Sequence, residues 1–166
     1  MLIRNILEES VRKFDEVKAV KWLKKKEIME RSYGELMENV VSTRKGLLAE
    51  GFEGKHIALI GTSSVEWMES YLGIITGCTT AVPLDAALPC EDLIDLLNRS
   101  DSVALFLSPK LKPYLDAFLE NCPKLQKVWM LQEEVEDAPA KVYGIGELRN
   151  LSLIHISEPT RRSYIS

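Results

Sequence analysis

Hydroxyl side chains gather directly after the first strongly apolar run of the sequence. The run His56–Ile60 is followed by Gly61, Thr62, Ser63 and Ser64. Hydroxyl groups at the start of a helix can hold a phosphate, because the free backbone N–H groups there attract anions. The sequence contains neither of the two glycine-rich patterns that identify nucleotide phosphate loops. The simpler interpretation is that Ser63 or Ser64 caps the helix.

Acidic side chains give weaker signals of chemistry. Asp85 follows the apolar run Thr80–Leu84, at the end of a strand where open α/β sheets bind ligands. A lone carboxylate in this place is expected to shape a loop or cap a helix more often than to catalyse. Glu66 is favoured by the dipole of its helix, and Trp67 beside it is expected to fill the core. Two acidic pairs are interpreted as solvated surface: Glu91/Asp92 and Glu133/Glu134.

Histidine and cysteine are too scattered to predict a reactive centre. Outside the C-terminal tail, His56 is the only histidine, so any Ser–His or Cys–His mechanism would run through it. Cys78, Cys90 and Cys122 form no C-x-x-C pair. We interpret them as reduced thiols in or near a core, the alternative being a zinc site or a disulfide framework. Reduced thiols indicate a cytoplasmic location, and no catalytic, cofactor-binding or metal-binding residue is predicted.

The composition is that of one folded domain. The chain has 166 residues, 46% hydrophobic and 28% charged, with a formal net charge of −4. These values argue against a disordered chain, and the lack of a basic patch interleaved with aromatic residues argues against nucleic acid. The most apolar stretch, Tyr71–Leu84, is broken by glycines and a proline, so no transmembrane segment is expected. Peripheral membrane contact stays open, and no signal peptide is expected, because charged residues appear early in the sequence.

The N-terminal segment predicts a short helix and a small β-hairpin. Asn5 is expected to cap a helix over Ile6–Phe14. Two strands, Lys18–Leu23 and Glu27–Ser32, then flank the turn Lys24–Lys26.

A longer helix follows the hairpin. Ser32 and Glu35 form a capping box at its start, and Gly51 is placed to end it in the left-handed conformation. Arg44 interrupts its apolar stripe. The residues expected on the buried face are Tyr33, Leu36, Met37, Val40, Leu47 and Leu48.

The middle of the chain alternates strand and helix, which is typical of a parallel sheet with helices on both faces. We therefore predict an α/β fold, and we interpret Glu133–Asn150 as a connector. The expected elements are the strand His56–Ile60, a helix from Ser63 or Ser64 to Thr76, the strand Thr80–Leu84, the helix Pro89–Asn98, the strand Val103–Leu107, the helix Pro109–Asn121 and the strand Lys127–Leu131.

The C-terminal tail resembles translated sequencing adapter. Residues Leu151–Arg161 read LSLIHISEPTR, which matches the translation of a transposon-type adapter, and the remaining residues fit its index and next constant bases. We expect residues 1–150 to be a partial N-terminal domain and 151–166 a non-native tail. The alternative is a genuine amphipathic C-terminus.

Several motifs in order resemble the adenylate-forming (AMP-binding) enzymes. Ser32–Leu36 is similar to the family's T/S-Y-x-E-L element, and Gly54–Ile60 with Thr62–Trp67 resembles its G-D-x-V-A-I-L-x-x-N-S-x-E-W segment. Gly77–Leu84 resembles the G-A-x-x-V-P-L strand, and Leu88–Pro89 begins a similar following helix. The departures from the pattern are Lys55, His56, Ser63 and Cys78.

The resemblance implies an N-terminal fragment of an acyl–CoA ligase, closest to the long-chain fatty acid type. Such enzymes use ATP and Mg²⁺ to form an acyl-adenylate and pass the acyl group to coenzyme A. In the family the catalytic motifs lie downstream of the region present here, so the fragment is expected to be inactive and to bind no cofactor. Two alternatives remain: a stand-alone α/β nucleotide- or flavin-binding module, and a non-catalytic partner of an adenylating subunit.

Overall fold

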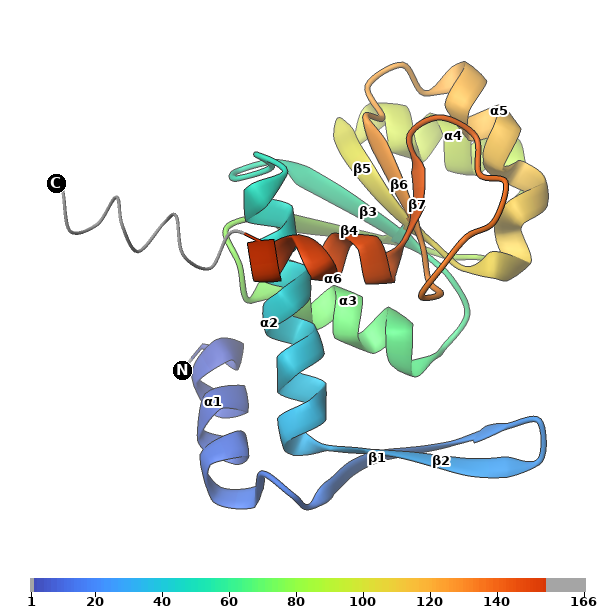
Figure 1. Cartoon of the computed structure of the whole chain (residues 1–166). Helices are drawn as coiled ribbons and strands as arrows, with labels where there is room; N and C mark the ends of the chain where they lie inside the picture. Colours follow the sequence, from blue (N-terminus) through green and yellow to red (C-terminus); the bar gives the residue numbers. More distant parts are fainter. Residues whose placement is uncertain (1, 155–166) are drawn as a thin grey trace, which may run out of the picture.

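A five-stranded sheet forms the centre of the molecule, because its strands are apolar on both faces. The computed structural model describes residues 2–154. The sheet has the order β4-β3-β5-β6-β7, and every pairing in it is parallel (Figure 1). Its strands are β3 (His56–Ile60), β4 (Thr80–Leu84), β5 (Ser102–Leu107), β6 (Lys127–Met130) and β7 (Val142–Gly144). The predicted α/β class is confirmed.

Helices cover both faces of this sheet. Successive strand residues point to opposite faces, so Ala58 and Ile60 join one core while Ile57 and Leu59 join the other. The first core is closed by α4 (Cys90–Arg99) and α5 (Leu115–Asn121). The second is closed by α2 (Tyr33–Ala49), α3 (Val65–Ile75) and α6 (Ile145–Ile154), on the opposite side in Figure 1.

The N-terminal helix begins earlier than predicted. α1 spans Ile3–Phe14, and the Leu2 carbonyl accepts from the backbone N–H groups of Asn5 and Ile6. Asn5 therefore lies inside the first turn and is not the cap. The hairpin agrees with the prediction: β1 (Lys18–Lys24) pairs antiparallel with β2 (Glu27–Ser32).

The start and end of α2 follow the sequence pattern, whereas its buried face differs. Ser32 accepts from the Glu35 N–H at 3.1 Å, and the Glu35 carboxylate accepts from the Ser32 N–H at 2.7 Å. Gly51 has a φ of 81°, as predicted. Leu48 is exposed, whereas Thr43 and Gly46 are buried, because α3 and α6 both pack on this helix. Met37 and Tyr33 are half-buried.

The predicted connector Glu133–Asn150 is wrong. Its second half forms β7, which extends the sheet, and α6, which packs against α2. Gly144 and Gly146 permit this, since an added Cβ would lie 2.3 and 2.6 Å from the Glu133 carbonyl oxygen. A three-residue strand and a glycine-containing helix leave almost no periodic signal in the sequence.

Two further boundaries differ in detail. The predicted helix Pro109–Asn121 is a 3₁₀-helix over Pro109–Tyr114 followed by α5, because Pro113 lacks the N–H that an α-helix interior needs. Pro89 is the residue before α4 and not part of its first turn. None of the helices within residues 2–154 combines the length and apolar character that crossing a bilayer would require.

Candidate functional site

The strand order places the carboxyl ends of β3 and β5 side by side, at the point where the order of the strands reverses. Ligands of open parallel sheets bind in the crevice at such a point. The loop Gly61–Ser64 follows β3, and the N–H of Ser108 after β5 donates to the Ile60 carbonyl at 2.9 Å. Thr62 and Ser63 are exposed there. This edge is the candidate ligand site that the topology indicates.

The residues at this edge have identifiable local roles. The Ser64 hydroxyl accepts from the Trp67 N–H at 3.1 Å and caps α3, as predicted. Trp67 is half-buried and stacks on Tyr71 at 5.3 Å between ring centroids. Asp85 accepts from the Ala87 N–H at 2.9 Å, which is the predicted loop-shaping contact. Glu66 lies in the first turn of α3.

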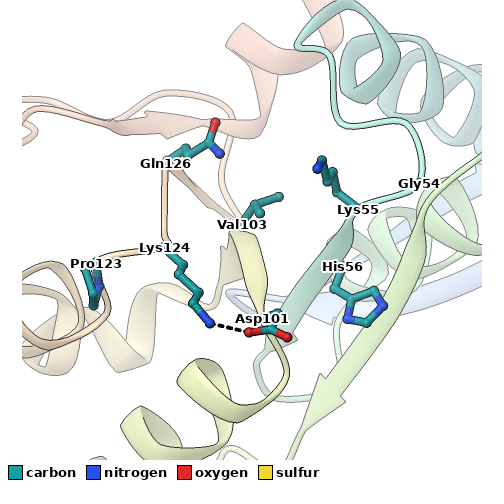
Figure 2. Close-up of a pocket in the computed structure, with 8 residues that line it drawn as sticks. All are labelled: Gly54, Lys55, His56, Asp101, Val103, Pro123, Lys124 and Gln126. Carbon is teal, nitrogen blue, oxygen red and sulfur yellow. Dashed lines mark hydrogen bonds and ion pairs between the residues drawn. The ribbon is translucent and has the colours of Figure 1, made fainter.

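A surface pocket of about 500 Å³ lies at the opposite edge, where the strands begin (Figure 2). Lys55, His56, Asp101 and Lys124 line it, and Lys124 forms an ion pair with Asp101. This contact and the charge of Lys124 hold the pKa of Asp101 below its usual range.

His56 belongs to this pocket and not to the carboxyl edge. Its Nδ1 lies 2.7 Å from the Ser100 carbonyl oxygen, so Nδ1 carries a proton and donates to the backbone. The loop after β3 and the ring of His56 lie at opposite ends of one strand. The structure therefore does not bring His56 to Ser63 or Ser64 for nucleophilic catalysis.

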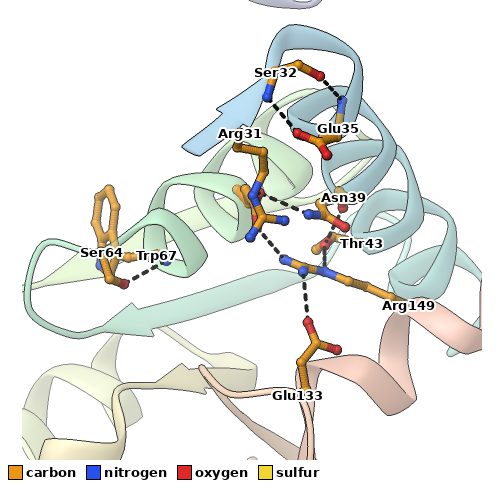
Figure 3. Close-up of polar contacts among 10 residues, drawn as sticks. Arg31, Ser32, Glu35, Asn39, Thr43, Ser64, Trp67, Glu133 and Arg149 are labelled. Carbon is orange, nitrogen blue, oxygen red and sulfur yellow. Dashed lines mark hydrogen bonds and ion pairs between the residues drawn. The ribbon is translucent and has the colours of Figure 1, made fainter. Parts of the chain in front are cut away.

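A buried network of charges joins four elements on the second core face (Figure 3). Glu69 on α3 is fully buried, and its carboxylate accepts from Asn39 of α2 at 3.0 Å. It also pairs with Arg31 of β2 at 3.1 Å and with Arg149 of α6 at 3.2 Å. Arg149 donates to Thr43 at 3.1 Å. The carboxylate of Glu69 therefore connects its own helix, α3, to the hairpin, to α2 and to α6.

The electrostatics of this network are set by burial. Burial raises the pKa of Glu69, while the hydrogen bond from Asn39 and the charges of Arg149 and Arg31 oppose the rise. Burial likewise lowers the pKa of Arg149, opposed by Glu69. Every polar neighbour of Glu69 in the network is a donor, and this geometry favours the ionised pair.

This network was not predicted from the sequence. A usable signal exists on α3, where Glu69 falls four residues after Val65 and four before Gly73, on the buried stripe of the helix. A charge in that position needs a buried partner. Its partners Arg31 and Arg149 are too distant in sequence to be predicted from spacing.

The acidic pairs and thiols complete the set of predicted residues. Glu91, Asp92, Glu133 and Glu134 are exposed, as expected, and Glu133 also lies 3.8 Å from Arg149. All three cysteines are free thiols. Cys122 is buried and Cys90 is half-buried, which agrees with the prediction of thiols in or near a core. Cys78 is exposed, so that prediction is wrong for this residue. Burial raises the pKa of Cys122 and of Cys90.

The described residues do not assemble a metal centre. Within residues 2–154, no three His, Cys, Asp or Glu side chains gather closely enough to hold a metal ion.

Comparison with known proteins gives a family match. The family described as "AMP-binding enzyme" matches residues 7–156. No curated protein sequence matches the chain significantly.

Solved structures share the fold. An anthranilate CoA ligase bound to anthranoyl-AMP is 16% identical with a TM-score of 0.75, covering 91% of this chain and 27% of its own length. Coronafacic acid ligase from Pectobacterium brasiliense is 20% identical with a TM-score of 0.80. The match covers 90% of this chain and 29% of the ligase. A proposed long-chain-fatty-acid CoA ligase from Rhodopseudomonas palustris is 11% identical with a TM-score of 0.75. The match covers 89% of this chain and 36% of that protein. This chain therefore spans about a third or less of each of these proteins.

Proposed function

The chain belongs to the AMP-binding enzyme family, and we propose that it is the N-terminal portion of an ATP-dependent acyl–CoA ligase. The observation that carries the proposal is the family match over residues 7–156. The similar solved structures that are named as ligases, and their greater length, support it.

Within that proposal, the carboxylic acid is a long-chain fatty acid and the protein acts in the cytoplasm. The support for the substrate is the sequence Val82-Pro83-Leu84-Asp85, which resembles the long-chain type after the second strand. In the structure this segment is the edge strand β4 and the loop that follows it. The three free thiols support the cytoplasm as the location, because it is a reducing compartment.

The family implies ATP, Mg²⁺ and coenzyme A as cofactors, and we propose that residues outside this chain supply the groups that bind them. No metal-ligand cluster is present within residues 2–154, and the hydroxyl of Ser64 is engaged in capping α3. We therefore assign no catalytic, cofactor-binding or metal-binding residue to this chain. Its part in the reaction is to supply the sheet and loops beside which the remainder of the enzyme would bind them.

We also propose that residues 151–166 are translated adapter and that the native segment is 1–150. α6 continues across this boundary to Ile154, and the rest of the tail lies outside the described residues. The test is to amplify the source locus and read past the codon for Asn150. A frame that continues into a serine-, threonine- and glycine-rich loop and later lysines supports both the ligase and the tail proposals. A genomic copy of LSLIHISEPTR would contradict the tail proposal.

The activity proposal has its own test. Purified protein with the present sequence is expected to give no ATP–pyrophosphate exchange with palmitate, whereas the complete reading frame is expected to give it. Clear exchange by the present chain would contradict its assignment as an inactive portion. Stoichiometric binding of a nucleotide or flavin, or co-purification with a separate adenylating subunit, would instead favour one of the two other functions named for this fold.

A further inference from the structure

The tip of the β1–β2 hairpin carries an exposed apolar pair. Leu23 and Ile28 are direct cross-strand partners, so their side chains lie on the same face of the hairpin. They are 70% and 72% exposed, the highest values among the large apolar side chains that the structure describes. On the opposite face of the hairpin, Trp22 and Met29 line a groove beside α2.

Lysines surround this pair. Lys24, Lys25 and Lys26 are all exposed, and the hairpin from Lys18 to Ser32 has six basic and two acidic side chains in a chain of net charge −4. Away from the tip, Lys21 pairs with Glu30 at 2.9 Å, and Lys18 lies 4.0 Å from the same carboxylate.

The turn holds its lysines in an unfavourable backbone conformation. Lys25 and Lys26 have φ angles of 48° and 70°, as in a type I′ turn, for which Asn-Gly is the preferred sequence. Residues other than glycine and asparagine are strained there. Strain of this kind concentrates at functional positions, and here it sets two positive charges at the end of the hairpin.

We propose that the hairpin tip is a docking site for an anionic lipid bilayer. Leu23 and Ile28 enter the interface between headgroups and acyl chains, while Lys24, Lys25 and Lys26 contact the phosphate groups. The hairpin extends away from the central sheet with its turn at the far end (Figure 1), so the tip can meet a flat surface first. A purely acidic protein partner would account for the lysines and leave the apolar pair without a role. The inference does not depend on the proposed enzymatic function.

The test is vesicle flotation of the present chain, because flotation separates lipid-bound protein from aggregates that sink. We expect the protein to float with vesicles of phosphatidylcholine and phosphatidylserine, and far less with phosphatidylcholine alone. Raising the salt concentration should release it, because salt screens the lysine–phosphate attraction.

Three variants locate the contact. Lys25→Asn/Lys26→Gly removes two charges while giving the turn its preferred sequence, so the hairpin stays folded. Each lysine near such a surface changes partitioning by about fivefold, so this variant should bind at least about tenfold more weakly. Leu23→Thr/Ile28→Thr keeps strand-forming residues but removes the apolar anchor, and should also lose about tenfold. Lys110→Asn/Lys112→Asn removes two exposed lysines elsewhere and should bind as the parent does.

The proposal is overturned by three results. These are equal flotation with neutral vesicles, unchanged binding by both hairpin variants, or equal loss of binding in the Lys110/Lys112 control. Binding to soluble polyglutamate that survives Leu23→Thr/Ile28→Thr, without vesicle binding, would assign the tip to an acidic protein instead.

Discussion

At the scale of single residues, the decisive feature is the charge of Glu69 inside the protein. Its carboxylate is fully buried and is approached by Asn39, Arg31 and Arg149. A buried carboxylate is costly unless each oxygen is paired with donors. The network therefore contributes less to net stability than to the arrangement of the four elements, which must converge for Glu69 to be satisfied.

Arg149→Met tests this role. The variant should lose about 3–5 kcal/mol of unfolding free energy, because it leaves Glu69 buried with one cation fewer. Urea unfolding at low protein concentration, followed by tryptophan fluorescence, measures the loss. Glu133→Ala is the matched control, since Glu133 is exposed and 3.8 Å from Arg149, and it should change stability by less than about 1 kcal/mol. Equal losses in the two variants would contradict the network.

The same variant should change the pH dependence of stability. Without Arg149, a charge that lowers the pKa of Glu69 is gone, and burial raises that pKa further above the ordinary 4.5. The folded state then keeps the proton at pH values where the unfolded state has lost it. Stability is therefore present at low pH and is lost as pH rises through the folded pKa. We expect the deficit in unfolding free energy relative to the parent protein to shrink as pH falls toward 4.5. A deficit that stays constant with pH would contradict this role of Glu69.

At the scale of elements, the contact between α2 and α6 determines how closely these two helices pack over the second core. Gly46 lies on the buried face of α2, and an added Cβ would lie 2.4 Å from the Leu148 carbonyl oxygen. Because backbone cannot move aside as a flexible side chain can, the two helices approach closely only where α2 has glycine. Leu148 is itself fully buried at this contact.

Gly46→Ala should separate the two helices. In an exposed helix this substitution would add about 0.5–1 kcal/mol of stability, so a loss identifies the packing contact. We expect a net loss of about 1–2 kcal/mol, since overpacking a core costs about 1–3 kcal/mol, read as a lower thermal midpoint by circular dichroism. Lys45→Ala, at the exposed neighbouring position, should leave the midpoint within a degree or two of the parent value. A gain in Gly46→Ala would contradict the close approach.

At the scale of the whole molecule, the N-terminal helix α1 leaves its apolar side chains uncovered. None of the residues of α1 is buried, and Ile3, Ile6 and Phe14 on that helix are exposed. If the proposed downstream part of the enzyme covers about 500 Å² of this surface, roughly 12 kcal/mol of burial is missing from the present chain.

The present chain should therefore bind hydrophobic dyes and self-associate. We expect strong fluorescence of the dye ANS with native protein, and sedimentation that shows larger species as concentration rises. The complete reading frame is the control and should bind far less dye per molecule. A monodisperse sample of the present chain with a sharp, reversible thermal transition and no dye binding would contradict this expectation.

Local patterns in the sequence determined most of the fold. Within the continuous apolar run His56–Ile60, the four residues after the exposed His56 are buried on both faces of the sheet. The capping contacts of Ser32 and Ser64 lie where predicted. These features depend on neighbours a few residues away, so a single sequence contains the necessary information. The order of the motifs likewise indicated the family that residues 7–156 match.

Only the tertiary structure decided the features that depend on distant contacts. β7 is three residues long and joins the sheet through its pairing with β6, so it has no periodicity of its own to detect. Arg31, Glu69 and Arg149 meet only because β2, α3 and α6 pack together. The exposure of Cys78 likewise depends on which elements of the fold pack near it. Spacing along a chain predicts which residues share one helix or strand; it does not predict which elements come together in space.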